Sequence, residues 1–223
     1  MCRDTLMAFS EQPDQRTNQI QRVVMSTRLP DALVEADPLV TIATSLRDAA
    51  ASVVGTVPPS ERDAAVVLPA DLARRLSLVG GRVSHTLAEH LATRLTRIRP
   101  GVSLLPREAT KHRATLLDVT RRDVLVALDF RRYESANVEL ARCVQEHSAR
   151  VVVITDTLLS PAVRSASVVL PVEVERASPF DTSVAAMALL DVLVFATTRV
   201  LGSSALERVA SSERLAEPYG VPE

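Results

Sequence analysis

Short apolar runs alternate with longer stretches of helical periodicity from residue 76 to residue 201, and this alternation most limits the fold. The apolar runs predict strands at residues 76–79, 102–105, 124–128, 151–154 and 168–170. The other stretches predict helices at residues 84–98, 109–117, 133–147, 160–164 and 179–201. Strands that alternate with helices through short connections form a parallel sheet with helices on both faces. We therefore expect an α/β fold, a three-layer α-β-α sandwich around a five-stranded parallel sheet of flavodoxin-like form.

Helix signals also precede the predicted sheet. Asp37 followed by Pro38 is typical of a helix start, with an N-cap and a proline at the first helical position. Ser60 and Asp63 form the capping box of a second helix, which we expect to end near residue 68. Residues 1–35 are polar with weak periodicity, which predicts a flexible arm or a marginal helix at residues 18–27. We therefore divide the chain into this arm (1–35), a helical linker (36–75), the sheet domain (76–202) and a C-terminal tail (203–223).

The composition excludes several classes of function. The net charge is −1 with both signs interspersed, so nothing favours nucleic acid or a membrane surface as a partner. Cys2 and Cys143 lack the spacing of a metal site or a disulfide framework, which favours a cytoplasmic location. No two histidines stand in a His-x-x-x-His pattern, so we expect no metal. We expect no cofactor either, because Arg82 stands at the second glycine position of a dinucleotide fingerprint and the third glycine is missing.

Residues 184–201 are nearly all apolar, but Asp191 lies near the middle of the segment and Arg199 near its end. A central aspartate is expensive in lipid. A helix that is apolar on most sides can instead be buried between a sheet and a partner subunit. We therefore expect no membrane partner, and a homodimer is the default interpretation of such a surface.

Two turns that follow predicted strands carry most of the chain's chemistry. In an open parallel sheet, ligands bind where strands end, and the free N–H groups of a helix start favour an anion there. Thr155 and Ser178 lie near later strand ends, where hydroxyls either contact a sugar or, more commonly, form caps and turns. The sequence predicts a site for a small anionic ligand that includes these two residues together with Gly80, Gly81, Arg82, Ser84, Asp129, Arg131, Arg132 and Tyr133.

The residues of the two turns also have purely structural interpretations. The glycine pair could serve only the turn, and Ser84 could serve only as a helix cap. Arg131 and Arg132 could be solvated or paired with Asp129. Asp129 would repel an anion, so it is better placed as a partner of Arg82 or Arg131.

Catalysis has little support in the sequence. His85 and Glu89 stand four residues apart on a predicted helix, which is weak evidence for a general base. The chain has no Gly-x-Ser-x-Gly motif and no other strong signal for a nucleophile. We therefore expect no catalytic residue and no enzyme activity.

Taken together, four stretches resemble a known family. They are Val79-Gly80-Gly81-Arg82-Val83-Ser84, Asp129-Phe130-Arg131-Arg132-Tyr133, Ile154-Thr155-Asp156 with Ser160-Pro161, and Ser178-Pro179-Phe180-Asp181. The span from about residue 76 to 201 resembles a SIS domain, the sugar-isomerase fold that binds phosphosugars, and is most similar to the effector domain of RpiR-type transcriptional regulators.

The first turn matches the common pattern of the family better than the second. The first turn of the family commonly reads Gly-x-Gly-x-Ser, so Gly80 and Ser84 match and Ser84 is implied as a ligand contact. The second commonly reads Ser-x-Ser-Gly, and here Asp129 and Arg131 stand at the serine positions and Arg132 at the glycine. Either arginines supply the anion contact, or an Arg82–Asp129 bridge partly fills the pocket.

The resemblance implies an effector-sensing domain that binds a sugar phosphate or a related small anion. The alternatives are an aldose–ketose sugar-phosphate isomerase and a non-catalytic interaction scaffold. Regulators of this family carry an N-terminal helix-turn-helix of about 60–75 residues. Residues 1–35 are expected to be at most a remnant of that module, so DNA is a partner only if a longer form carries it.

Overall fold

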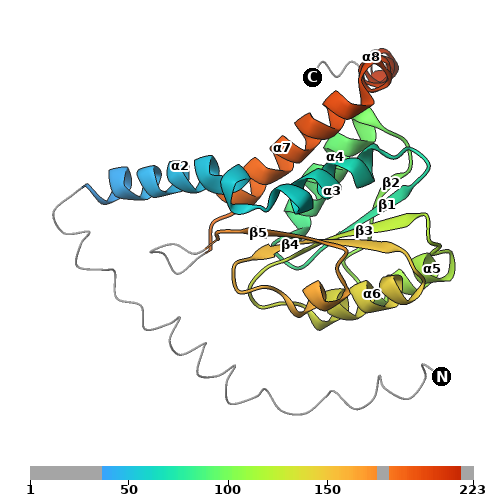
Figure 1. The fold of residues 1–223 in the computed structure, drawn as a ribbon, viewed down its shortest axis with the longest axis horizontal. Helices are drawn as coiled ribbons and strands as arrows, with labels where there is room; N and C mark the ends of the chain where they lie inside the picture. Colours follow the sequence, from blue (N-terminus) through green and yellow to red (C-terminus); the bar gives the residue numbers. More distant parts are fainter. Residues whose placement is uncertain (1–36, 175–180, 217–223) are drawn as a thin grey trace, which may run out of the picture. The chain divides into compact units, whose positions relative to one another are not determined.

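The computed structural model describes residues 37–174 and 181–216 of the chain. Its strands are β1 (Arg75–Gly80), β2 (Val102–Leu104), β3 (Asp123–Asp129), β4 (Arg150–Asp156) and β5 (Val168–Val172). Neighbouring strands pair in parallel in the order β2-β1-β3-β4-β5 (Figure 1). The predicted five-stranded parallel sheet is confirmed. Buried parallel strands tend to be continuous apolar runs, which is why the sequence indicated them.

Contacts within the chain define two units. Residues 37–45 with 181–182 belong to one unit, and residues 46–174 with 183–216 belong to the other. Helix α2 (Pro38–Thr56) begins in the first unit and ends in the second. The whole sheet belongs to the second unit, and so do both turns of the candidate site.

The two faces of the sheet are covered by different helices (Figure 1). Leu76, Leu78 and Val126 belong to one hydrophobic cluster with α3 (Pro59–Ala70), α4 (His85–Ile98) and α7 (Val184–Leu201). Leu125 and Val153 belong to a second cluster with α6 (Ser135–Glu146). Successive side chains of a strand point to opposite faces, so one run of apolar residues fills both layers. The three-layer sandwich is thereby confirmed.

Short helices complete the layers. A 3₁₀ turn (Ala109–Lys111) leads into α5 (His112–Leu117), and the expected helix at 160–164 is a 3₁₀ helix, Pro161–Ser165. Ser160 caps it as predicted, accepting a hydrogen bond from the Ala162 N–H at 3.1 Å. The Asp37 cap of α2 is also present, with the Leu39 N–H at 2.9 Å from the Asp37 carboxylate.

Several predicted boundaries are wrong. Helix α3 has Pro58 rather than Ser60 at its N-cap, and it runs two residues beyond the expected end. The expected tail after residue 202 contains α8 (Ser203–Ala216). The helix expected from residue 179 is described only from Val184, while residues 181–183 are not helical. The expected helix at 18–27 lies outside the described residues.

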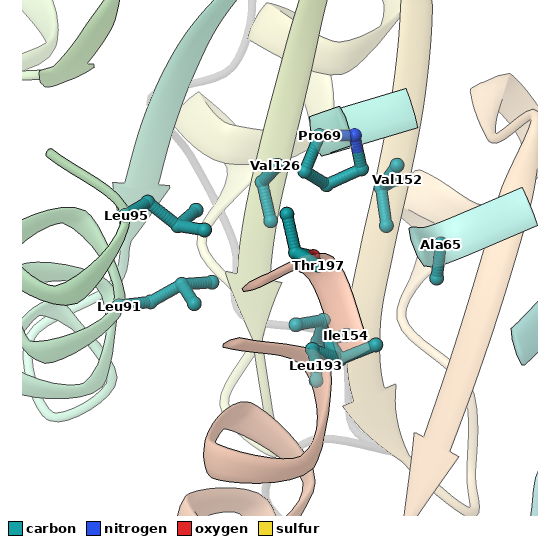
Figure 2. A pocket seen from close by; sticks show the side chains of 9 residues that line it. All are labelled: Ala65, Pro69, Leu91, Leu95, Val126, Val152, Ile154, Leu193 and Thr197. Carbon is teal, nitrogen blue, oxygen red and sulfur yellow. The ribbon is translucent and has the colours of Figure 1, made fainter. Parts of the chain in front are cut away.

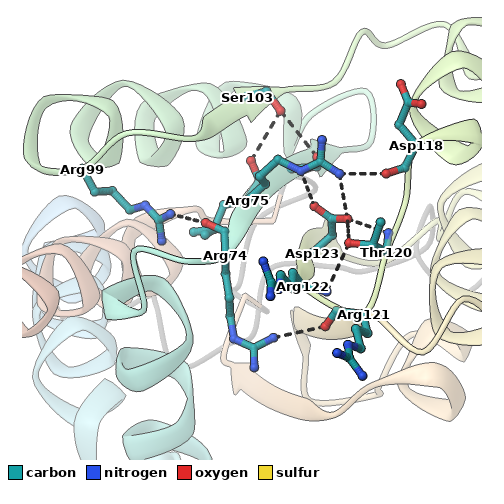
Figure 3. Close-up of polar contacts among 11 residues, drawn as sticks. Arg74, Arg75, Arg99, Ser103, Asp118, Thr120, Arg121, Arg122 and Asp123 are labelled. Carbon is teal, nitrogen blue, oxygen red and sulfur yellow. Dashed lines mark hydrogen bonds and ion pairs between the residues drawn. The ribbon is translucent and has the colours of Figure 1, made fainter.

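The edge where strands begin is held by a polar network (Figure 3). Arg75 of β1 and Asp123 of β3 are paired in the sheet register, and the Arg75 Nε lies 2.7 Å from the Asp123 Oδ1. Thr120 donates two further hydrogen bonds to Asp123. Burial opposes ionisation of Asp123, but these hydrogen bonds outweigh it and lower its pKa.

Arg99 follows α4 and is fully buried without a carboxylate partner among the described residues. Its guanidinium donates to backbone carbonyls instead, at 2.5 Å to Pro69 O near the end of α3, at 2.8 Å to Pro100 O, and to Arg74 O. Burial lowers the pKa of Arg99, and the charge of Asp71 opposes this. One side chain thus joins the ends of α3 and α4 to the start of β1.

Helix α7 is the one described helix long and apolar enough to cross a membrane by length and composition. A core helix passes the same test, and Leu189, Leu190 and Leu193 of α7 are buried in the cluster that covers the sheet. Its Thr197 faces a small cavity of about 20 Å³, otherwise lined by apolar side chains of α3, α4, α7, β3 and β4 (Figure 2).

Candidate functional site

The two predicted turns meet at the point where the strand order reverses. Gly80 at the end of β1 pairs in register with Leu128 near the end of β3. Helix α4 then covers one face of the sheet and α6 the other, so the loops that precede them diverge from neighbouring strand ends. Such a switch point is the usual ligand site of an open parallel sheet.

Ser84 is held between the two strands. Its hydroxyl donates to the Leu128 carbonyl at 2.6 Å and accepts from the Gly81 N–H at 2.8 Å. It makes no side-chain cap bond to α4, so the capping alternative is wrong. Because the only hydroxyl proton is used within the protein, Ser84 in this conformation offers a ligand no more than a lone pair.

Gly80 allows this close approach. A Cβ atom there would lie 2.5 Å from the Ser84 carbonyl oxygen and 2.6 Å from the His85 nitrogen. Both atoms are backbone, so a side chain at this position would require the turn to open. The glycine is therefore needed for the turn itself, whether or not a ligand is bound.

The side chain of Glu134, a residue not among those predicted from the sequence, reaches the loop after β1. It is the N-cap residue of α6, and its Oε1 accepts the Arg82 N–H at 2.7 Å and lies 3.9 Å from Arg82 Nε. The side chain crosses above Gly81, where a Cβ would lie 3.1 Å from Oε1. A carboxylate that closely follows two arginines at a helix start is the one sequence signal that could have identified it.

The alternative of a bridge between Arg82 and Asp129 is wrong, because Arg82 pairs with Glu134. Asp129 is buried and accepts the Glu134 N–H at 3.2 Å and the Ser160 hydroxyl. Burial raises the pKa of Asp129, and the hydrogen bonds from Ser160 and the Glu134 backbone reduce this effect. Asp129 thus fixes the geometry of the second loop through these buried hydrogen bonds.

Tyr133 connects the second loop to β4, and Thr155 of β4 holds the loop that follows that strand. The Tyr133 hydroxyl donates to Asp156 Oδ1 at 2.8 Å, and the Thr155 hydroxyl accepts the Ser160 N–H at 3.0 Å. Burial, followed by the hydrogen bond to Asp156, raises the pKa of Tyr133. Thr155 is fully buried, so it acts as the turn residue that its alternative interpretation proposed.

The arginines lie in loops rather than in a helix. The helix expected from residue 133 begins only at Ser135, after Arg132, which has a left-handed φ of 69°. Arg132 is exposed and Arg131 half-buried. Arg107, which was not predicted as a site residue, donates to the Arg82 carbonyl at 3.1 Å and brings a further positive charge.

The remaining candidates are less central. Ser178 lies outside the described residues. Glu89 is exposed, and no contact joins it to His85, whose Nδ1 is buried without a hydrogen-bond partner in the described part of the chain. Within residues 37–174 and 181–216, no group of three metal-binding side chains is present.

A family model for the SIS domain matches residues 72–196, which is more than half of the chain. The chain belongs to the SIS-domain family. No curated protein matches it in sequence.

Several solved structures share the fold of this SIS domain. The sugar isomerase domain of an RpiR transcription factor from Sphaerobacter thermophilus is 20% identical, with a TM-score of 0.72 over 78% of this chain and 97% of that one. The Vibrio vulnificus NanR protein complexed with ManNAc-6P is 18% identical, with a TM-score of 0.70 over 85% and 72% of the two chains. A putative sugar-phosphate isomerase from Listeria monocytogenes is 13% identical, with a TM-score of 0.60 over 85% and 92%. At these identities the likeness establishes the shared fold.

Proposed function

We propose that this SIS domain is the effector-sensing part of an RpiR-type transcriptional regulator and binds a sugar phosphate or a related small anion. The observation that carries the proposal is the meeting of the two loops at the switch point, with Arg82, Arg107, Arg131 and Arg132 around them. Arginine forks match the oxygens of phosphate and carboxylate groups. The likeness to an RpiR domain and to NanR in complex with ManNAc-6P supports the same ligand class.

Sensing without catalysis is the better-supported activity. Asp129, Glu134 and Asp156 each accept hydrogen bonds from the protein's own groups, so all three have a structural role that requires no proton transfer to or from a ligand. The likeness to a putative sugar-phosphate isomerase keeps the isomerase as the second candidate. A scaffold that binds no small molecule is the third.

Calorimetry against a panel of anions distinguishes the three functions. The panel is inorganic phosphate, glucose 6-phosphate, fructose 6-phosphate and N-acetylmannosamine 6-phosphate, each also incubated with protein and analysed for aldose–ketose conversion. Binding without conversion supports sensing, and conversion supports the isomerase. A complete lack of binding contradicts both and favours the scaffold.

Arg131→Ala tests the arginine contact directly. We expect it to weaken binding of the best panel member by about 1–3 kcal/mol, the range for a charged hydrogen bond. Arg150→Ala is the matched control, because Arg150 is exposed at the opposite edge of the sheet, where β4 begins. Equal affinities in the two variants would contradict the role of Arg131.

We also propose that the domain is a cytoplasmic homodimer and contacts DNA only through a helix-turn-helix in a longer form. The support is the exposure of apolar side chains on α7 and α8, where Phe195 is 64% and Leu206 65% exposed. Light scattering at micromolar concentration tests the dimer, and Phe195→Glu is expected to yield monomers. A monomeric wild-type protein would contradict this proposal.

A further inference from the structure

The structure assigns to Glu134 the role of a built-in competitor for the ligand anion. Its carboxylate binds the same backbone N–H and approaches the same guanidinium, both of Arg82, that an anion at the first loop would use. A ligand anion must therefore displace Glu134 before it can bind. This inference rests on the proposed anion-binding function and adds a residue that sets the affinity.

Both N–H groups at the start of the first loop are already occupied. The Gly81 N–H donates to Ser84 Oγ at 2.8 Å, and the Arg82 N–H donates to Glu134 Oε1 at 2.7 Å. The Ser84 bond is buried and joined to the Leu128 carbonyl, so it belongs to the framework of the sheet. Of these two N–H groups, the Arg82 N–H is therefore the one that can bind a ligand, and it is bonded to the Glu134 carboxylate.

Two anions cannot share this position. A phosphate oxygen placed on the Arg82 N–H would need the space of Oε1, and the two negative charges would repel each other at that distance. Once the carboxylate leaves, Arg82 offers its amide together with a side chain that is 77% exposed. Charge-assisted bonds of this kind are among the stronger polar contacts, so the exchange replaces one strong contact with another.

Glu134 can leave, whereas Asp129 cannot. The Glu134 side chain is 32% exposed, and its carboxylate contacts the backbone N–H and the guanidinium of Arg82, which is itself at an exposed position. Gly81 has no side chain to trap it, and its position at the N-cap leaves the hydrogen bonds of α6 intact when it turns. Asp129 is 2% exposed and is fixed by Ser160 and by the Glu134 N–H.

Calorimetric titration with inorganic phosphate and with glucose 6-phosphate tests the inference. We expect Glu134→Ala to bind each anion about tenfold more tightly than the wild type, because the competing charged hydrogen bond is gone. Glu134→Gln, which keeps an acceptor oxygen but no charge, should lie between the two. Glu207→Gln removes one negative charge from an exposed position on α8 and should leave both affinities unchanged.

Amide hydrogen exchange supplies a measurement that needs no ligand. The Arg82 amide should exchange faster in Glu134→Ala than in the wild type, while the Gly81 amide stays protected by Ser84. Unchanged exchange at Arg82 would overturn the inference, because the contact would then be absent in solution.

The titration also separates this inference from the proposed function. If the wild type binds either anion and both Glu134 variants bind it equally or more weakly, the competitor role is overturned and anion sensing stands. If only the Glu134 variants bind, both proposals are supported. If no protein binds any member of the larger sugar-phosphate panel, anion sensing fails and the role of Glu134 fails with it.

Discussion

Gly80 and Gly81 are adjacent residues of the same type, but a side chain at each position would contact different neighbours. A Cβ at Gly80 would lie 2.5 Å from backbone of the next turn, whereas one at Gly81 would lie 3.1 Å from the end of the flexible Glu134 side chain. We expect Gly80→Ala to lower the free energy of unfolding by about 2 kcal/mol or more, and Gly81→Ala by less than about 1 kcal/mol. Urea denaturation measures both values, and equal losses would show that the turn is not closed as described.

Arg132 stores backbone strain within the second loop. It is a non-glycine residue with a φ of 69°, at the position where the family commonly has glycine. We expect Arg132→Gly to raise the free energy of unfolding by up to about 1 kcal/mol, and Arg132→Val to lower it by about 1 kcal/mol or more. Thermal or urea unfolding of the two variants is the measurement, and a destabilised glycine variant would contradict the strain.

At the scale of elements, β3 has an aspartate at each end, Asp123 and Asp129, and their pKa values are shifted in opposite directions. The pKa of Asp123 is lowered, so its ionised form stabilises the fold above the pKa of the unfolded chain, about 3.9, and this contribution is lost as the pH falls through the folded pKa. The pKa of Asp129 is raised, so its contribution is complete below the unfolded pKa and is lost as the pH rises through the folded pKa.

Unfolding experiments between acidic and neutral pH test the two signs. We expect Asp123→Asn to flatten the loss of stability on acidification, and Asp129→Asn to remove a loss that occurs as the pH rises from acid. The wild-type curve is the reference for both variants. Slopes of the same sign for the two residues would show that the contacts of one of them are not those described.

Arg99 joins three elements through carbonyl groups alone. Arg99→Met keeps much of the side-chain volume but leaves the carbonyls of Pro69, Arg74 and Pro100 without this donor. We expect a loss of about 3 kcal/mol or more in unfolding free energy, as for a broken buried charged contact. Arg94→Met, at an exposed position of α4, is the control and should change stability by less than about 0.5 kcal/mol.

At the scale of the whole molecule, a small cavity beside a buried hydroxyl group lies between the sheet and the helices that cover it. Thr197 Oγ1 is buried without a hydrogen-bond partner among the described residues and borders the cavity of about 20 Å³. A water there would need two or more polar partners, and the lining supplies one. We expect Thr197→Val to raise unfolding free energy by about 1 kcal/mol.

Thr198→Val is the matched control for this change. The Thr198 hydroxyl donates to the Val194 carbonyl at 2.7 Å, so removal of this hydroxyl should not raise the free energy of unfolding. Urea denaturation compares the two variants under one condition. A Thr197→Val protein no more stable than the wild type would show that the hydroxyl finds a partner in solution.

The sheet could be predicted because its central strands β3 and β4 are buried on both faces and appear as apolar runs in the sequence. The start of α6 could not, since the left-handed backbone of Arg132 leaves no mark in an ordinary arginine. Helix α8 was missed because it has few buried apolar positions, with only Ala205 in the core cluster.

The meeting of the two loops could be predicted, but their contacts could not. Whether Ser84 caps a helix, binds a ligand or joins two strands depends on the register of β1 against β3. The Glu134–Arg82 contact spans 52 residues and follows from the same register, so no local pattern shows it.

The Ser84 hydroxyl gives the rim of the sheet one further property. It joins the turn after β1 to the last carbonyls of β3, and the Ser160 hydroxyl similarly joins the turn after β4 to Asp129. Neither loop can open alone without breaking a bond of its neighbour. Two hydroxyl groups thus tie three neighbouring strand ends to one another, so a loop that opens at one of them must break a hydrogen bond to the next.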